Sequence, residues 1–96
     1  RSVYLVAYDI SDDKRRESAF RTLRGFGDHL QYSVFRVDAS ETELVRLRAR
    51  LTAIIDHKTD RVLLADLGPS DGRGATAMST LGVPSETSGG RSAIIW

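Results

Sequence analysis

The sequence contains no cysteine and only two histidines. Neither a disulfide framework, a thiolate metal site nor a cluster of histidine ligands is therefore available, and any metal ion would have to be bound by oxygen atoms. Long apolar runs are missing as well, because no stretch approaches the roughly 20 residues of a membrane span. The first residues also read as a strand and not as a charged leader. We expect a cytoplasmic protein that does not bind membranes.

An excess of charge is also missing, because the net charge of the 96 residues is only +1. This balance does not by itself indicate a nucleic-acid-binding protein. Twelve of the fourteen basic residues are arginines, however, and the planar guanidinium group suits phosphate better than the lysine ammonium group does. Genomic base composition explains such enrichment equally well. With 41% hydrophobic residues, the length predicts one small domain whose core a partner subunit would help to complete.

The stretch from Val3 to Asp9 is apolar and β-branched or aromatic up to its last residue, without a strand breaker. Such a run is typical of a strand that is buried on both faces in the middle of a sheet. Asp9 ends it, where a rigid backbone holds a carboxylate that still reaches solvent, as metal-binding and catalytic acids require. The alternative is that Asp9 caps the next helix, although Ser11, Asp12 and Asp13 are available to do so.

A helix is predicted from Asp13 to Arg24, with Gly25 or Gly27 ending it. Arg15 and Arg16 lie in its first turns, close enough to Asp9 to share a site with it. The positive end of the helix dipole favours anions at the same place. We therefore predict that Arg15 and Arg16 bind the phosphate backbone of a nucleic acid, the alternative being a solvated helix face.

The middle of the chain predicts a strand, a helix and another strand. Leu30 to Val37 reads as extended structure, and Ser33 within it leaves open a bulge or a break into two short strands. Ser40 to Glu43 is a capping box, and leucine and isoleucine recur on one helical face up to Ile55. Arg61 to Leu67 is the last clear strand.

The remaining residues predict less regular structure. We expect Gly68 to Ala77 to be a connection, Met78 to Val83 to be a short strand and Ser85 to Gly90 to be a flexible spacer. Arg91 to Trp96 is again strand-like, and its glycine tether allows it to pair with its own sheet or with the edge of a neighbour's.

This order predicts an α+β fold, the ferredoxin-like β-α-β-β-α-β arrangement with an additional C-terminal β-strand. Residues 1–84 would form the domain, and residues 85–96 the spacer and the last strand. A flavodoxin-like α/β fold survives if residues 30–37 form a single strand, but it would have too few strands to cover helices on opposite faces.

Four short stretches together resemble a known family. They are Val-Ala-Tyr-Asp-Ile at residues 6–10, Asp-Lys-Arg-Arg at 13–16, Gln-Tyr-Ser-Val-Phe at 31–35 and the apolar ending Ile-Ile-Trp at 94–96. The sequence resembles, over nearly its whole length, the second universal Cas protein, the small CRISPR-associated nuclease family of spacer acquisition.

The resemblance implies a ferredoxin-like homodimer in which Asp9 of each subunit faces its mate and binds a divalent cation, usually Mg²⁺. It implies a metal-dependent endonuclease that cleaves single-stranded RNA or double-stranded DNA. It also implies a CRISPR adaptation role as the central dimer that bridges two dimers of the integrase, the first universal Cas protein.

Matched residue by residue, the family pattern implies that Tyr8 is the aromatic residue beside the metal-binding acid. Arg16 matches a basic residue on the first helix, and Ser33 and Phe35 match the second-strand motif that serves nucleic-acid binding. Relatives often have arginine where this chain has His29, so the resemblance implies a phosphate contact by protonated His29.

Two other functions stay open on the residues alone. One carboxylate rarely holds Mg²⁺ by itself, so catalysis requires a two-fold axis that doubles Asp9, and no dedicated general base stands out. A structural nucleic-acid-binding adaptor without catalysis is therefore the first alternative. A ferredoxin-like regulatory module that binds a small ligand is the second, and it predicts affinity that does not depend on salt.

Overall fold

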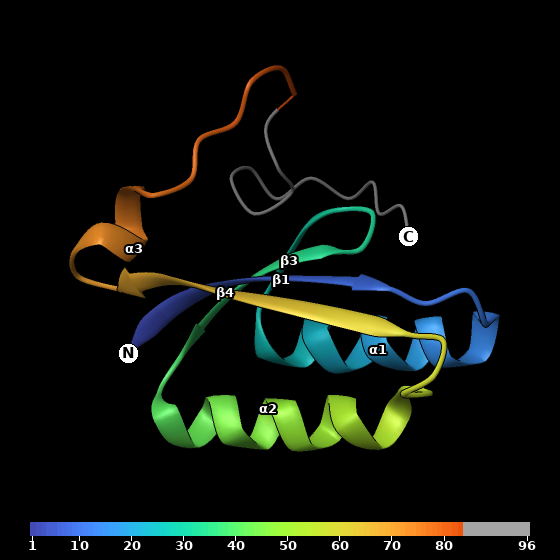
Figure 1. Ribbon diagram of the computed structural model, residues 1–96. Helices are drawn as coiled ribbons and strands as arrows, with labels where there is room; N and C mark the ends of the chain where they lie inside the picture. The colour runs from blue at the N-terminus through green and yellow to red at the C-terminus, as the bar shows by residue number, and fades with distance from the viewer. Residues whose placement is uncertain (84–96) are drawn as a thin grey trace.

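The protein consists of a four-stranded antiparallel sheet with two long helices against one of its faces (Figure 1). The computed structural model describes residues 1–83. Its elements, in chain order, are β1 (Ser2–Asp9), α1 (Asp13–Phe26), β2 (Asp28–Gln31), β3 (Val34–Ala39), α2 (Glu41–Ile54), β4 (Arg61–Pro69) and α3 (Arg73–Thr76). The strand order is β2-β3-β1-β4. The predicted β-α-β-β-α-β arrangement is confirmed.

The core lies between the sheet and the two helices because side chains alternate along each strand. Val6, Tyr8 and Ile10 of the first strand and its extension point toward the helices. They meet the apolar stripes of both helices there, including the fully buried Leu23 and Leu47. β1 pairs with β3 on one side and β4 on the other, so the central position predicted for it is confirmed. The predicted burial on both of its faces is wrong for the single chain, because Leu5 and Ala7 on the face away from the helices are only half-buried.

Both helices begin where their capping residues predict. The Asp12 carboxylate accepts a hydrogen bond of 2.9 Å from the Arg15 amide and so caps α1. Ser40 and Glu43 form the predicted capping box of α2. α1 continues two residues beyond the predicted end at Arg24, because Gly25 stays helical and the amide of Gly27 bonds to the Leu23 carbonyl.

The segment predicted to be extended, Leu30 to Val37, is divided at Tyr32 and Ser33 into β2 and β3. The two strands form a hairpin with antiparallel pairing, which includes His29 opposite Phe35. The break that Ser33 left open is therefore present, and the flavodoxin-like alternative is wrong. Both crossover helices consequently lie on the same face of the sheet (Figure 1).

The region after β4 differs from its predictions. Residues 68–77 contain the short helix α3, which packs against β1 over Val3. A side chain on Gly74 would approach the backbone oxygen of Gly68 to 2.5 Å, so glycine is required for this contact. The strand predicted at Met78 to Val83 is wrong, because Gly82 adopts a left-handed φ of 87° and interrupts extended backbone.

The predicted spacer and C-terminal strand, residues 85–96, lie outside the described residues. Within residues 1–83, no helix has the length and apolar character needed to cross a membrane.

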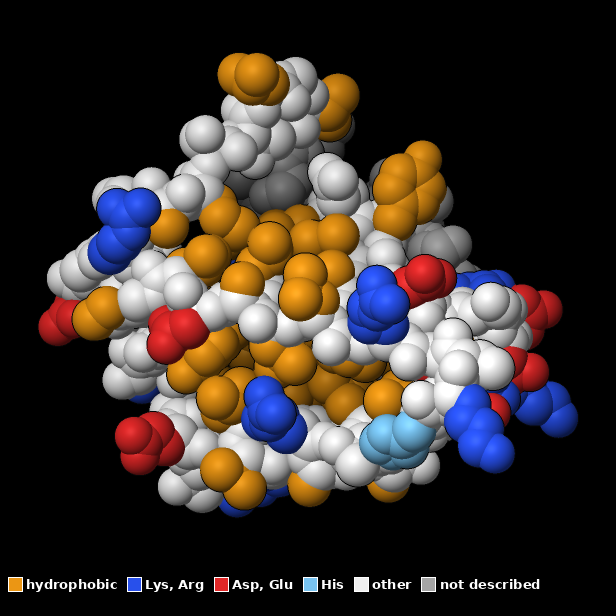
Figure 2. Space-filling model, in the orientation of Figure 1, with side chains coloured by type: hydrophobic (Ala, Val, Ile, Leu, Met, Phe, Trp, Pro, Cys, Tyr) orange, Lys and Arg blue, Asp and Glu red, His pale blue; other side chains and the backbone are white. Residues whose placement is uncertain are grey.

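The face of the sheet opposite the long helices carries an apolar surface. Leu63 is 60% exposed there, and half-buried neighbours in register surround it. Figure 2 shows hydrophobic side chains gathered along β4 on this side. We call this surface the open-face patch; it consists of Leu5, Ala7, Val34, Leu63 and Ala65. Asp9 and Arg61, which are paired in register, lie at one end of it.

Candidate functional site

An open hollow lies where β1 ends, beside the turn between β2 and β3. Four residues predicted from the sequence line it, and two further residues do so that were not predicted. The predicted ones are Tyr8, Asp9, Arg16 and Ser33, and the others are Ile10 and Tyr32. The fold therefore brings together side chains from the first strand, the first helix and the hairpin turn.

Asp9 is exposed at the last position of β1. Because Asp12 caps α1, the alternative in which Asp9 serves as the helix cap is wrong. Among residues 1–83 the Asp9 carboxylate makes no hydrogen bond or ion pair. It is thus an acid fixed by the central strand and open to a ligand, as a metal-binding or catalytic carboxylate must be.

The Tyr8 hydroxyl is buried beneath the hollow and has no hydrogen-bond partner within the described chain. Burial raises the pKa of this phenol, and the nearby positive charge of Arg16 opposes the shift. Tyr8 therefore remains protonated at neutral pH and can donate a hydrogen bond. An unpaired buried hydroxyl is costly, so a ligand oxygen in the hollow would gain from meeting it.

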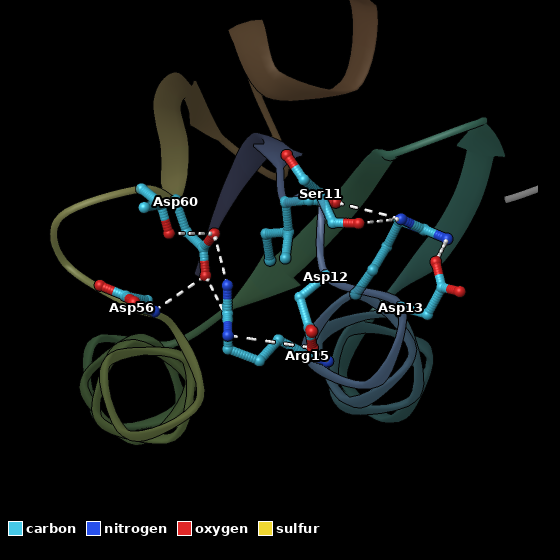
Figure 3. Close-up of polar contacts among 9 residues, drawn as sticks. Ser11, Asp12, Asp13, Arg15, Asp56 and Asp60 are labelled. Carbon is cyan, nitrogen blue, oxygen red and sulfur yellow. Dashed lines mark hydrogen bonds and ion pairs between the residues drawn. The ribbon is translucent and has the colours of Figure 1, made fainter.

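Arg16 fixes the loop that follows Asp9. Its guanidinium group donates to the carbonyls of Ile10 and Ser11 at 3.3 and 3.0 Å and pairs with the Asp13 carboxylate (Figure 3). These contacts involve both terminal nitrogens of the group, and the side chain remains about one third exposed at the hollow. Arg16 is therefore positioned both to hold the loop and to place positive charge beside Asp9.

Arg15 turns away from the hollow toward the loop before β4 (Figure 3). Its Nε donates to Asp60 Oδ2 at 2.7 Å, and the Asp60 side chain is fully buried. The backbone amide of Asp56 donates to the same carboxylate at 2.8 Å. The Arg15 hydrogen bond, followed by that of Asp56, lowers the pKa of Asp60 to about 2. Arg15 thus joins α1 to the loop before β4. A contact between Arg15 and phosphate stays a prediction.

His29 and Phe35 lie in the core, at 3% and 0% exposure. Their rings are 5.0 Å apart, and His29 Nε2 donates to the Tyr32 carbonyl at 2.6 Å. Neither side chain has surface with which to contact a nucleic acid in this conformation, so the predicted direct contacts do not match their positions. Both side chains support the hairpin turn from below. Ser33 lines the hollow, and its carbonyl accepts from the Tyr8 amide at 3.1 Å.

The oxygen donors at the hollow suit a hard cation such as Mg²⁺, but one chain supplies only one carboxylate there, Asp9. Within the described part of the chain, no group of three or more acids and histidines could hold a metal ion. The residues therefore fit a divalent cation only if a second chain contributes its own Asp9.

Known proteins share both the sequence and this fold. The family model described as CRISPR associated protein Cas2 matches residues 2–72. The chain is 41% identical over 68 residues to CRISPR-associated endoribonuclease Cas2 1 of Rhodospirillum rubrum, which covers 71% of this chain and 67% of that protein. The chain belongs to the Cas2 family. It is also 38% identical over 69 residues to CRISPR-associated endoribonuclease Cas2 of Geobacter sulfurreducens, covering 72% of this chain and 73% of that one.

Solved structures agree with the assignment to the Cas2 family. Streptococcus pyogenes Cas2, crystallised at pH 6.5, superposes with a TM-score of 0.72 at 32% identity and covers 83% of this chain and 99% of its own. A hypothetical protein from Thermus thermophilus gives the same TM-score at 34% identity, covering 86% and 93%. The resemblance stated from the four sequence stretches is confirmed.

Sequence reasoning missed two residues that shape this Cas2-family site. Tyr32 belongs to one of the four motif stretches, but its place in the turn has no sequence signal of its own; the neighbouring Ser33 is the residue type that indicates a turn. Asp60 carries no sequence signal of its own, and its role depends on Arg15, 45 residues earlier. No local pattern identifies a pair at that separation.

Proposed function

We propose that this Cas2-family chain is a metal-dependent endonuclease that works as a homodimer on a nucleic acid. The observation that carries this proposal is one hollow lined by the exposed Asp9, by Arg16 and by Tyr8, whose buried hydroxyl has no hydrogen-bond partner within residues 1–83. An acid, a neutral donor and a cation are the groups that bind a phosphodiester and a metal ion together. The names of relatives, which include the word endoribonuclease, agree with it.

The open-face patch supports the homodimer. Leu63 exposes 60% of its surface on a strand, where an isolated small domain gains by covering it. A two-fold contact over this patch would join the ends of two β1 strands, because Asp9 and Arg61 border it. Two Asp9 carboxylates then supply the ligands that one chain lacks.

The reaction would be hydrolysis of a phosphodiester: a water oxygen bonds to phosphorus as the bond to the leaving oxygen breaks. A bound Mg²⁺ ion would polarise the phosphate and lower the pKa of the attacking water. Asp9 would hold that ion, Arg16 would offset negative charge on the phosphate, and the Tyr8 hydroxyl would donate to a phosphate oxygen. Because no dedicated general base lines the hollow among the described residues, we expect slow turnover.

Asp9→Asn should abolish cleavage. The change keeps the shape of the side chain but removes the charge that binds the cation, so we expect the rate to fall by about 100-fold or more. Because Asp9 is exposed, the midpoint of thermal unfolding should not change. The measurement is a gel assay on labelled single-stranded RNA and duplex DNA with and without Mg²⁺.

Asp71→Asn is the matched control, because this aspartate is also exposed and lies outside the hollow. Magnesium-dependent cleavage that persists in Asp9→Asn would remove Asp9 from the mechanism. Binding that does not weaken with salt would instead favour the small-ligand regulatory module over any nucleic-acid function.

Leu63→Asp should convert the dimer to a monomer. A carboxylate in the middle of the open-face patch would be buried without a partner across the interface. Val45→Asp is the control, because Val45 is similarly exposed, at 67%, but lies on α2 away from the patch. Light scattering at micromolar concentration should give twice the chain mass for wild type and Val45→Asp, and a monomeric wild type would contradict the dimer.

A second candidate function is an adaptor that binds nucleic acid and bridges two integrase dimers during spacer acquisition without cleaving. The single carboxylate at the hollow favours it, since within residues 1–83 no group of three or more acids and histidines is placed to hold a metal ion. Capture of the integrase by Asp9→Asn as well as by wild type, with no cleavage by either protein, would identify the adaptor.

A further inference from the structure

Tyr32 is the most exposed aromatic residue within residues 1–83, at 65% exposure. It occupies the turn between β2 and β3 with a φ of 38°, the only positive φ among the described residues that are not glycine. A bulky residue in the left-handed region is strained, and glycine or asparagine would relieve that strain. The ring therefore persists at a position whose backbone favours other residues.

The backbone on both sides of Tyr32 is fixed. His29 Nε2 donates to the Tyr32 carbonyl at 2.6 Å, and the Tyr8 amide donates to the Ser33 carbonyl at 3.1 Å. His29 is itself packed edge-on against Phe20, with ring centroids 5.0 Å apart. These contacts attach the turn to the core and to β1 while the phenol ring is left at the surface.

The Tyr32 side chain lines the same hollow as Asp9 and Arg16. An aromatic ring and a guanidinium group on one surface match two parts of a nucleotide, because bases stack on rings and phosphates bind cations. A base within a duplex is already stacked on its neighbours, whereas a base in a single strand is free to stack on a protein ring.

We propose that Tyr32 stacks on a nucleobase of a single-stranded nucleic acid and thereby selects single strands at the Asp9 site. This inference rests on the proposed function, to which it adds the residue that recognises the substrate. The strain at Tyr32 would be offset on binding, because the fixed backbone of the turn already holds the ring at the site and less conformational entropy is lost.

Tyr32→Asn tests the stacking directly, measured in the Asp9→Asn background so that nothing is cleaved. Binding of a labelled single-stranded oligonucleotide, followed by fluorescence anisotropy, should weaken by about 5- to 150-fold, as loss of one stacked base implies. Tyr32→Phe keeps the ring and should bind within about twofold of the parent. Duplex affinity should be the same for all three proteins.

The temperature of thermal unfolding should change in the opposite direction to the affinity, or not at all. Because asparagine tolerates the left-handed turn, Tyr32→Asn should unfold at the same temperature as its parent or at a higher one. Weaker binding by a protein of equal or greater stability is a result that a purely structural tyrosine would not give.

An oligonucleotide in which the bases are removed from successive sugars gives an independent comparison on the parent protein alone. It should bind as weakly to the parent as the intact oligonucleotide binds to Tyr32→Asn. Equal affinity for the intact and the abasic strands overturns the proposal, whether or not Tyr32→Asn folds. Equal losses in Tyr32→Phe and Tyr32→Asn also overturn it, because the hydroxyl and not the ring would then be the contact.

The results that would contradict the proposed endonuclease function differ from those that would contradict the role of Tyr32. If the Asp9→Asn variant with Tyr32 unchanged still cleaves, or if no variant binds nucleic acid of any kind, the endonuclease assignment fails. If cleavage requires Asp9 while intact and abasic strands bind equally, only the role of Tyr32 fails.

Discussion

Phe35→Ala should lower the free energy of unfolding by about 3–5 kcal/mol. Phe35 is fully buried, and its ring lies 5.5 Å from that of Phe20 and 5.0 Å from that of His29, measured between centroids. Alanine would leave a cavity beneath the hairpin turn that these rings cannot fill. Small domains are stable by only about 5–15 kcal/mol, so a large share of the total would be lost. Denaturant titration followed by circular dichroism measures the change.

Two variants separate the packing role of Phe35 from its predicted role in nucleic-acid binding. Phe35→Leu preserves most of the volume and should lose less than about 1.5 kcal/mol, with unchanged affinity for nucleic acid. Val45→Ala removes a largely exposed side chain and should change stability by less than about 0.5 kcal/mol. A Phe35→Leu protein of normal stability that no longer binds nucleic acid would show a direct contact.

Asp60→Asn should lower the midpoint of thermal unfolding by about 5 °C or more at neutral pH. The Asp60 carboxylate is buried and accepts from Arg15, from the Asp56 amide and from the Thr59 hydroxyl. An asparagine amide group has only one acceptor atom to offer these donors and would place its own N–H bonds against one of them. Asp71→Asn, at an exposed position, is the control and should unfold like wild type.

The same carboxylate makes stability depend on pH. The pKa of Asp60 is about 2 in the folded protein, below its ordinary value of 3.8, because Arg15 and the Asp56 amide bind the charged form. The unfolded state therefore takes up a proton first as pH falls. The contribution of Asp60 is fully present above about pH 4 and is lost as pH falls toward 2. Asp60→Asn should show a flatter loss of stability between these values, and an unchanged slope would contradict the assignment.

Much of the fold was predictable because its signals are local. The capping box at Ser40 and Glu43 and the apolar run before Asp9 each specify an element from neighbouring residues. The end of α1 was predicted two residues early because glycine at position 25 was read as a stop. Glycine is tolerated within a helix when later contacts continue, here those of Phe26, over whose ring Arg50 lies at 5.9 Å.

The site was predictable in outline and not in its arrangement. Asp9, Tyr8, Arg16 and Ser33 were named from the sequence and line one hollow. Arg15 stands next to Arg16 in the chain, yet its side chain contacts Asp60 because adjacent helical residues point in directions about 100° apart. Sequence spacing places both arginines near the site, and only tertiary contacts distinguish their roles.

The register of β4 has a consequence for the order of folding. The partner that β4 supplies at the end of β1 is Arg61, and it lies more than 50 residues from Asp9 along the chain, whereas the β2–β3 hairpin closes within a few residues. Long loops close late because their conformational entropy must be overcome before the contacts form. During synthesis, the surroundings of Asp9 would thus be completed only after β4 has left the ribosome, so that a partly made chain has no finished site.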